Sequence, residues 1–363
     1  MSKNKVVGLR GSRMKVAVVS LRFAAGHIAH LRAYRELFKE LNCDVKLFLD
    51  KPYEGFIEPD TSITFINSYD AVHEWNPDTV FSYNIANENI KLAKLCKKRQ
   101  VPFYYVLHEP WDSFKELLTL RDRIPRRIAA NAVNYLTCKN AYKVILASKN
   151  GKTKFETYMR GCNKNYTVFP LLFCDEFDSS EEIERKYFSY IGGFTENRGC
   201  LAFLKFIEYS VEKNLGIRFK IATRTDISAY IKAEIMQKAI HDGFLVVQDG
   251  KPMTTKEINR HYREAICVWN AYISSTQSGV LPNALMQGAP VIVRDRGVAE
   301  EVIQDKVEGC YISIPHNNDE ILAAYQYIQM NLSEFVSNAR KCFLKNYMYS
   351  AFLDKAKEVY EVK

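Results

Sequence analysis

The sequence has no apolar run long enough to cross a membrane. Its most apolar stretches, residues 16–21 and 144–147, have the length of strands, whereas a bilayer span needs about 20 apolar residues. The polar and basic residues 1–13 contain no apolar core, so we expect no secretory signal peptide. The nine cysteines are odd in number and form no C-x-x-C pair, which argues against a disulfide framework and a structural zinc site. These absences predict a cytoplasmic protein.

Acidic side chains are scarce in the first half of the chain. Residues 1–180 hold 28 basic and 19 acidic side chains, whereas residues 181–363 hold 23 of each, so the first half carries the whole net charge of +9. This asymmetry predicts either an anionic surface or substrate for the first half, or simply a solvated face. The charge is diffuse and no nucleic-acid-binding motif accompanies it, so we expect no nucleic-acid partner.

Strand-like and helix-like segments alternate along most of the 363 residues, which predicts parallel sheets built from βαβ units. The length and the 47% hydrophobic content predict two globular domains. The alternation pauses in the acidic residues 174–186, which we interpret as a linker. We therefore expect a basic tail at 1–13, a first Rossmann-like domain at 14–173, a second at 187–345, and a terminal helix at 346–363 that crosses back to the first domain.

Several spaced motifs resemble the GT-B glycosyltransferases of the retaining family 4 group. Residues 288–309 read GAPVIVRDRGVAEEVIQDKVEG, similar to the family's G-x-P-V-I segment with its following glycine and glutamate. Residues 187–199 (YFSYIGGFTENRG) and 257–269 (EINRHYREAICVW) resemble the two strand regions that precede it, and residues 107–109 occupy the place of a strand-end histidine. The resemblance implies an α/β fold of GT-B architecture, with two doubly wound domains facing across a cleft.

The segment 278–288 is the first candidate for binding the donor nucleotide-sugar. A loop rich in serine and threonine leads into a short helix, whose amide groups favour an anionic diphosphate at Ser278, Gly279 and Val280. The family places two glutamates here, one on the donor sugar and one on the ribose. Their positions hold Ser275 and Asn283, which lack the charge, so the sequence departs from the pattern at the donor sugar.

The loop after the strand at 187–191 is the second donor candidate. Gly192 and Gly193 permit close approach of the backbone to phosphate. The family holds the diphosphate here with an arginine and a lysine. Gly193 occupies the arginine position, while Arg198 occupies the lysine position and keeps the charge. Arg224, which follows the next predicted strand, is a candidate to replace the missing arginine.

His108 ends the apolar strand VPFYYVLH, where it is either a structural histidine or a residue of the functional crevice. The resemblance implies that it hydrogen-bonds near the reacting sugar or the acceptor. Glu109 and Asp112 are candidate acceptor contacts or, in an inverting enzyme, a general base. We therefore group His108, Glu109 and Asp112 as candidate catalytic residues.

Three more residues complete the predicted site. Gly26 is the glycine that remains in the turn after the first strand, where the family approaches the donor phosphate and the acceptor. His27 follows it, and Trp111 lies beside the candidate carboxylates, where an aromatic ring suits the apolar face of a sugar. We assign His27 and Trp111 to acceptor binding. His27 and His30 share a helix face but have no third ligand, so we predict no metal site.

Residues 114–128 combine leucines with four arginines, which predicts either an ordinary amphipathic helix or peripheral contact with an anionic membrane. The resulting functional hypothesis is a cytoplasmic, metal-independent glycosyltransferase without a cofactor. Its donor is a nucleotide-sugar, UDP-linked by family frequency, and its acceptor is a glycan or lipid-linked glycan of surface polysaccharide assembly. A non-catalytic GT-B subunit and a nucleotide-sugar 2-epimerase are the alternatives.

Overall fold

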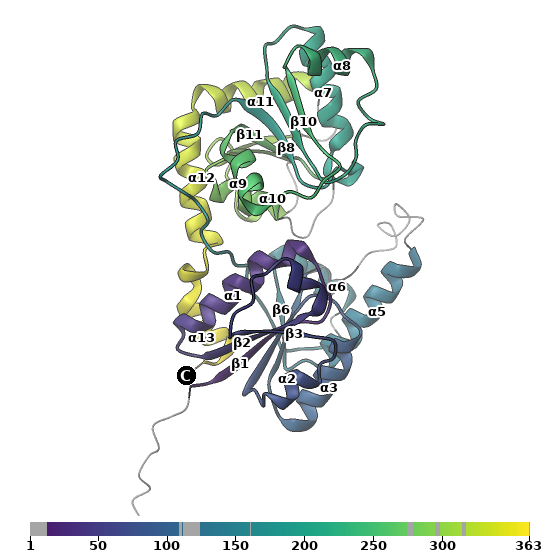
Figure 1. Ribbon diagram of the computed structural model, residues 1–363, viewed down its shortest axis with the longest axis vertical. Coiled ribbons are helices and arrows are strands. Elements are labelled where there is room, and N and C mark those ends of the chain that lie inside the picture. Colours follow the sequence, from purple (N-terminus) through teal and green to yellow (C-terminus); the bar gives the residue numbers. More distant parts are fainter. Residues whose placement is uncertain are drawn as a thin grey trace, which may run out of the picture. The chain divides into compact units, whose positions relative to one another are not determined.

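The computed structural model describes residues 13–108, 111, 124–159, 161–273, 279–294, 298–313 and 317–362. These residues form two compact units. Unit 1 ends first at Ala147, resumes over Gly151–Cys174 and takes up the chain again from Phe352. Unit 2 comprises Ser148–Asn150 and Asp175–Ala351. Each unit is a parallel sheet with helices on both faces (Figure 1).

Unit 1 contains a seven-stranded parallel sheet with the order β3-β2-β1-β4-β5-β6-β7. Its strands are β1 (Lys15–Ser20), β2 (Asp44–Asp50), β3 (Ile63–Ile66), β4 (Thr79–Tyr83), β5 (Phe103–Leu107), β6 (Lys143–Leu146) and β7 (Tyr166–Val168). Its helices are η1 (Ala25–His27), α1 (Ile28–Glu40), η2 (Lys51–Gly55), α2 (Asp70–Glu74), α3 (Glu88–Arg99), α5 (Ile124–Asn140), α6 (Lys149–Tyr158) and the C-terminal α13 (Leu353–Tyr360).

Unit 2 contains a six-stranded parallel sheet with the order β10-β9-β8-β11-β12-β13. Its strands are β8 (Tyr187–Ile191), β9 (Phe219–Ala222), β10 (Leu245–Gln248), β11 (Ala265–Asn270), β12 (Val291–Arg294) and β13 (Gly309–Ile312). Its helices are η4 (Glu196–Arg198), α7 (Cys200–Glu212), α8 (Glu234–His241), α9 (Thr255–Arg263), α10 (Val280–Met286), η5 (Val298–Glu301), α11 (Asn318–Met330) and α12 (Leu332–Asn346), and η6 (Tyr349–Phe352) precedes α13.

The central strands of both sheets are mostly apolar, with Thr79, Ser82 and Asn270 as buried polar exceptions. Every residue of β4, β5 and β11 is buried. A parallel sheet covered by helices on both faces buries both sides of its inner strands, so these strands read as continuous apolar runs rather than as an alternation. The predicted fold class of two doubly wound Rossmann-like units is thereby confirmed.

The three strands that the sequence did not predict all lie at sheet edges. They are β3, β7 and β13, each three or four residues long. All residues of β7 and three of the four in β3 are only half-buried. An edge strand pairs on one side only, so it needs neither the length nor the apolar run of an inner strand.

The C-terminal helix α13 completes the core of unit 1. The Tyr360 ring packs at 5.2 to 5.4 Å, centroid to centroid, from four aromatic rings, those of Phe38, Phe81, Tyr104 and Phe169. The Lys143 side chain donates to the Val359 carbonyl at 2.9 Å, which satisfies one of the last carbonyls of the helix. Unit 1 is therefore assembled from both ends of the chain.

Residues 175–186 contain no strand or helix and are held to unit 2 by arginine side chains. Arg340 forms a bidentate ion pair with Asp175, at 3.0 and 2.7 Å. The guanidinium groups of Arg340 and Arg263 lie 4.5 and 5.3 Å from the Phe177 ring. Arg185 donates to the carbonyls of Ala265 and Gln287 at 2.8 and 2.6 Å. This stretch is anchored over most of its length.

Candidate functional site

The strand order of each sheet locates a crevice. In unit 1 the chain proceeds outward from β1 to β3 and then returns to add β4 on the other side of β1. In unit 2 the same reversal separates β8 from β11. Ligands of open α/β sheets bind outside the carboxyl ends of the strands at such a reversal. The predicted site residues follow β1 and β5 in unit 1 and β8, β9 and β11 in unit 2.

Three histidines gather at the carboxyl ends of β1 and β5 in unit 1. The rings of His27 and His108 are stacked, with centroids 4.8 Å apart and planes within 7°. Tyr83, the last residue of β4, meets both rings edge-on at 5.1 and 4.6 Å. His30 Nδ1 donates to the Leu172 carbonyl at 3.0 Å, so a main-chain hydrogen bond holds this ring in the group. The structure thus brings together the predicted residues His27 and His108.

Burial keeps the histidine group neutral. Desolvation lowers the pKa of His27 to about 4 and that of His30 to about 3, and it holds the pKa of His108 well below its usual range. Among the described residues, His27 Nδ1, His108 Nε2 and the Tyr83 hydroxyl have no hydrogen-bond partner. A neutral imidazole can donate through one nitrogen and accept through the other, which suits hydroxyl groups.

The loop between β1 and α1 is fixed by side chains from neighbouring strands. The Tyr53 hydroxyl accepts from the Ala24 amide at 3.0 Å, and Asp50 accepts from the Phe23 amide at 2.9 Å. Gly26 is exposed, and a Cβ added there would meet nothing within 4 Å. The loop is therefore held in place, while its glycine borders open space.

The remaining unit 1 candidates are less fully described. Trp111 is half-buried and packs against the apolar core of unit 1, so only part of its ring is available to a ligand. The predicted residues Glu109 and Asp112 lie outside the described residues, as does most of the segment 114–128.

In unit 2 the turn after β8 receives the side chain of Arg198. A Cβ added at Gly193 would lie 2.9 Å from Arg198 Nη1 and 3.4 Å from its Cζ. A Cβ added at Gly192 would lie 3.4 Å from Nη1 and 3.2 Å from Val280 Cγ2. The sequence predicts that phosphate approaches the backbone of Gly192 and Gly193. In the structure the Arg198 guanidinium and the Val280 side chain lie over these glycines instead.

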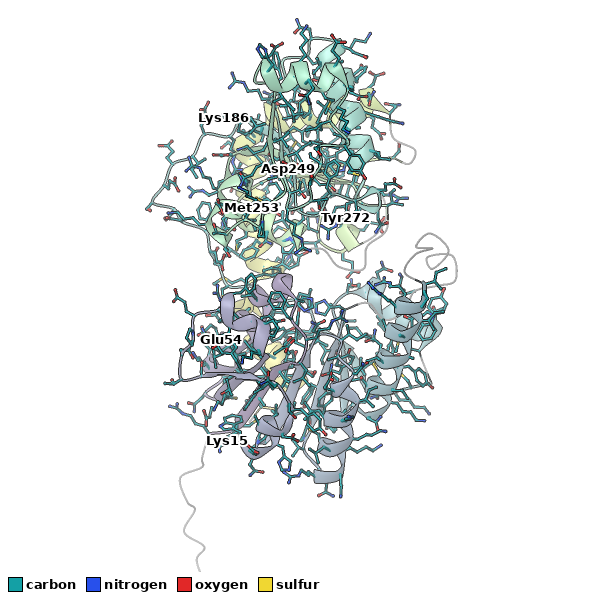
Figure 2. All side chains as sticks on the ribbon, turned by 45° about the vertical axis from the view of Figure 1, so that its right-hand side comes forward. Lys15, Glu54, Lys186, Asp249, Met253 and Tyr272 are labelled. Carbon is teal, nitrogen blue, oxygen red and sulfur yellow. The ribbon has the colours of Figure 1, made fainter. Side chains whose placement is uncertain are left out.

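Arg198 is stacked on an aromatic ring that the sequence analysis did not select. Its Cζ lies 5.5 Å from the ring centroid of Tyr272. Tyr272, labelled in Figure 2, lies two residues beyond β11. Within the described ranges, no hydrogen bond or ion pair engages the Arg198 guanidinium. A guanidinium held by its face on an aromatic ring keeps its N–H edge available for phosphate oxygens.

Two main-chain bridges join the loops that carry Arg198 and Tyr272. The Trp269 indole donates to the Arg198 carbonyl at 3.2 Å, and the Ile273 amide donates to the Asn197 carbonyl at 2.8 Å. Gly199 sits inside this junction with φ +73°, and a Cβ there would lie 2.7 Å from the Ala271 carbonyl oxygen. Glycine is required at 199 because both its conformation and its surroundings exclude a side chain.

The other predicted donor residues lie nearby or outside the described ranges. Val280 begins α10, and Gly279 precedes it. A Cβ at Gly279 would lie 3.9 Å from the Asn283 side-chain amide, which is half-buried. Arg224 is exposed beyond the end of β9 and has no polar contact within the described ranges. Ser275 and Ser278 lie outside the described residues.

Sequence reasoning also missed Arg294, the last residue of β12. Its Nη1 donates to the carbonyls of Tyr272, at 3.3 Å, and of Ile273. The signal was available, because an arginine that directly ends an apolar strand satisfies the same rule that selected Arg224. No sequence signal pointed to Tyr272.

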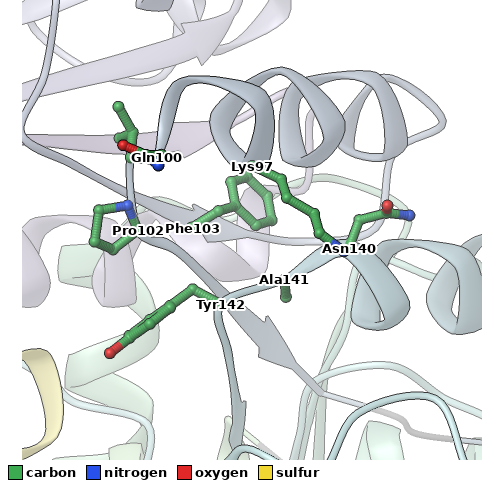
Figure 3. A pocket seen from close by; sticks show the side chains of 8 residues that line it. Lys97, Gln100, Pro102, Phe103, Asn140, Ala141 and Tyr142 are labelled. Atoms are coloured by element: carbon green, nitrogen blue, oxygen red, sulfur yellow. The ribbon is translucent and has the colours of Figure 1, made fainter.

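The described residues meet the requirements of neither a metal site nor a membrane span, and they line a cavity away from the predicted site. No group of three or more histidine, cysteine or acidic side chains is arranged to hold a metal ion there, and no helix within them is long and apolar enough to span a bilayer. A cavity of about 480 Å³ opens at the amino-terminal side of the unit 1 sheet, lined in part by Lys97, Phe103 and Tyr142 (Figure 3). It lies at the opposite strand ends from the histidine group.

The comparisons with known proteins agree with this architecture. Residues 185–329, all in unit 2, match the profile of the family described as glycosyl transferases group 1. No curated protein sequence matches the chain significantly. The pneumococcal O-GlcNAc transferase GtfA, in complex with UDP and GlcNAc, is similar in structure, with a TM-score of 0.69 and 10% identity over 97% of this chain and 99% of GtfA.

Two further solved structures are similar over nearly their whole length. Sucrose-phosphate synthase from Thermosynechococcus elongatus has a TM-score of 0.71 and 13% identity, over 96% of this chain and 98% of its own. HepE from Anabaena, in complex with UDP, has a TM-score of 0.68 and 14% identity, over 96% of this chain and 100% of its own. The predicted resemblance to GT-B glycosyltransferases is confirmed, while the retaining family 4 subgroup stays a prediction.

Proposed function

We propose that this chain is a glycosyltransferase that moves a sugar from a nucleotide-sugar, by default a UDP-sugar, to a glycan or lipid-linked glycan in surface polysaccharide or glycoconjugate assembly. The observation that carries the proposal is the cationic site at the β8/β11 reversal, where Gly192, Gly193, Arg198 and Val280 converge. Two of the similar structures are complexes with UDP, which supports a uridine nucleotide as the ligand to test first.

Unit 2 binds the donor. Arg198 offers its N–H edge to the diphosphate and stabilises the negative charge that develops as this leaving group departs. Asn283 hydrogen-bonds the ribose, where an amide oxygen accepts from a hydroxyl without charge assistance. The family pattern implies transfer with retention of the anomeric configuration, without a metal ion or other cofactor.

Unit 1 supplies neutral hydrogen-bonding groups to the acceptor or the transferred sugar. His108 and His27 carry depressed pKa values, so at neutral pH they position hydroxyl groups without adding positive charge. Trp111 offers the exposed part of its ring to an apolar sugar face. The protein's contribution is orientation of the reacting groups and electrostatic stabilisation of the leaving group.

A lipid-linked acceptor requires contact with a membrane surface. Helix α5 carries Arg126 and Arg127 in its first turn, followed by the exposed apolar side chain of Ile128, at 54% exposure, and further along the helix by that of Leu136, at 44%. This combination suits peripheral binding to the anionic inner face of the cytoplasmic membrane. Co-sedimentation with vesicles of anionic and of neutral lipid tests it. Preferential binding to anionic vesicles, weakened in Ile128→Ser/Leu136→Ser, is expected, and equal recovery with both would refute it.

The donor assignment is tested by thermal shift and calorimetry with UDP, GDP and their sugars, in the presence of EDTA. A ligand that binds only the folded state raises the melting temperature. We expect one nucleotide series to raise the melting temperature, and this shift should be lost in Arg198→Ala. The matched control is Arg218→Ala, which should retain the shift because Arg218 lies at the amino-terminal end of β9, away from the carboxyl ends of the strands. No shift in a protein that melts cooperatively would refute the donor site. Nucleotide-sugar binding without nucleotide release, with any acceptor supplied, would instead support a non-catalytic subunit.

A further inference from the structure

We propose that Tyr272 and Arg294 are positioning residues for Arg198, so that phosphate recognition depends on a three-residue relay from β12 to the turn after β8. This inference rests on the proposed donor site and names the residues that aim its arginine. Tyr272 lies outside the motifs that suggested the site, and Arg294, although it falls within the motif at 288–309, was not among the predicted site residues.

The first link of the relay fixes the main chain at Tyr272. The Tyr272 amide donates to the Asn270 carbonyl at 3.0 Å, and the Tyr272 carbonyl accepts from Arg294 at 3.3 Å. The next carbonyl, at Ile273, also accepts from Arg294, and the Ile273 amide is bonded to Asn197. These bonds tie the chain beyond β11 to β12 on one side and to the Arg198 loop on the other.

The second link fixes the guanidinium. The Tyr272 ring lies 5.5 Å from Arg198 Cζ, and the guanidinium also lies against the bare backbone of Gly193. An acidic partner would orient the arginine but cancel its charge, whereas an aromatic ring orients it and leaves the charge intact. The arrangement therefore presents one full positive charge in a defined position, in a loop where Gly193 offers no second cation.

Arg294 acts at a distance through backbone, because its Nη1 is already engaged with the two carbonyls. Losing it would free the Tyr272 main chain and, with it, the ring on which Arg198 rests. A lysine at 294 can donate to the same carbonyls through its one terminal nitrogen, whereas methionine, of similar length, cannot donate. The relay therefore predicts graded effects at position 294 and dependence on the ring, not the hydroxyl, at position 272.

The test compares UDP with uridine on the full chain by isothermal titration. Uridine reports base and ribose binding, so the ratio of the two dissociation constants isolates the phosphate contribution. We expect Tyr272→Leu and Arg294→Met to weaken UDP binding about 5-fold to 10-fold, as the loss of an oriented cation–π pair suggests, with uridine binding changed less than about twofold. Tyr272→Phe and Arg294→Lys should retain most UDP binding. Tyr327→Leu is the matched control, because Tyr327, on α11, also forms a cation–π contact, in its case with Lys306.

A double-mutant cycle decides whether the residues act through Arg198. If they do, Tyr272→Leu adds almost nothing once Arg198→Ala is present. Additive losses, equal losses for uridine and UDP, or UDP binding unchanged in Tyr272→Leu would overturn the relay while leaving the donor site intact. Failure of the unaltered chain to bind UDP, or binding indifferent to Arg198→Ala, would instead refute the proposed donor site and the relay with it. Melting curves of Tyr272→Leu and Arg294→Met, compared with those of Tyr272→Phe and Arg294→Lys, distinguish folding defects from loss of Arg198 orientation.

Discussion

Replacing Gly193 with alanine should impair phosphate binding while leaving the fold intact. The added Cβ would lie 2.9 Å from Arg198 Nη1, closer than real Cβ contacts. Ordinary van der Waals contacts of carbon begin at about 3.5 Å. The Arg198 guanidinium must therefore move away by about half an ångström or adopt another rotamer. The atom in the way is the end of a flexible side chain rather than backbone, and φ at Gly193 is not in the left-handed region.

Gly193→Ala should change the free energy of UDP binding more than the free energy of unfolding. An off-rotamer adjustment of Arg198 costs about 0.5–1.5 kcal/mol, and alanine in place of glycine restores about 0.4–1 kcal/mol by restricting the unfolded chain. The free energy of unfolding should therefore change by less than about 1 kcal/mol. A hydrogen bond to a charged group contributes about 1.5–3 kcal/mol, so partial loss of phosphate contact should weaken UDP binding about 10-fold, or about 1.4 kcal/mol.

The assay pairs a urea unfolding curve with UDP titration for Gly193→Ala, using Gly55→Ala as the matched control. A Cβ at Gly55 would meet nothing within 4 Å. We expect both variants to unfold like the unaltered chain and only Gly193→Ala to lose UDP affinity. Unchanged UDP affinity in Gly193→Ala would refute the placement of Arg198 over the turn, and a large loss of stability would refute the view that only a flexible side chain must move.

Three further outcomes follow from the same physical reasoning. Gly199→Ala should lower the free energy of unfolding by more than 2 kcal/mol or so, measured by urea unfolding, because φ is +73° and a backbone oxygen would lie 2.7 Å from the Cβ; stability equal to that of Gly193→Ala would contradict this. Between pH 6.5 and 4 the unfolded chain binds a proton that His27, with its folded-state pKa of about 4, does not, so His27 by itself should lower the free energy of unfolding by about 3 kcal/mol as the pH falls. Unfolding curves across this range should show a weaker fall in His27→Gln, and an equal fall would exclude His27 as a source. Tyr360→Ala should destabilise unit 1 by about 3–5 kcal/mol, seen by calorimetry as an early transition separate from that of unit 2, and a single unshifted transition would contradict the packing.

The inner strands were predictable from sequence because burial on both faces imposes an unbroken apolar run. The pattern at 103–107 and at 265–270 leaves little alternative to an inner strand of a parallel sheet. Three of the four edge strands, β3, β7 and β13, escaped because one free side relaxes that requirement. Strand β7 is three half-buried residues, and β13 begins at Gly309, where a Cβ would collide with the Val291 carbonyl. Glycine there marks close strand approach, which a propensity argument reads as a turn.

The site was predictable where it depends on strand ends and hidden where it depends on side-chain contacts. His108 was found because strand alternation fixes where its strand stops, and Arg198 because the resemblance implies a cation at its position in the loop after β8. The stacking of His27 on His108 joins residues that follow β1 and β5, which are far apart in the chain, and no local pattern encodes it. Tyr272 resembles any surface tyrosine in sequence, and only its place opposite Gly193 and Arg198 distinguishes it.

The return of α13 to unit 1 has a consequence for how the protein is made. A ribosome emits the chain from its N-terminus, so unit 1 begins to emerge first, yet the ring of Tyr360 fills its core only after residues 353–360 have been translated. Unit 2, which is complete before this helix is translated, can finish folding while unit 1 still lacks its last element. A stop codon before α13, or a bulky domain fused after it, would thus harm unit 1, which begins the chain, more than unit 2, which directly precedes this helix in the sequence.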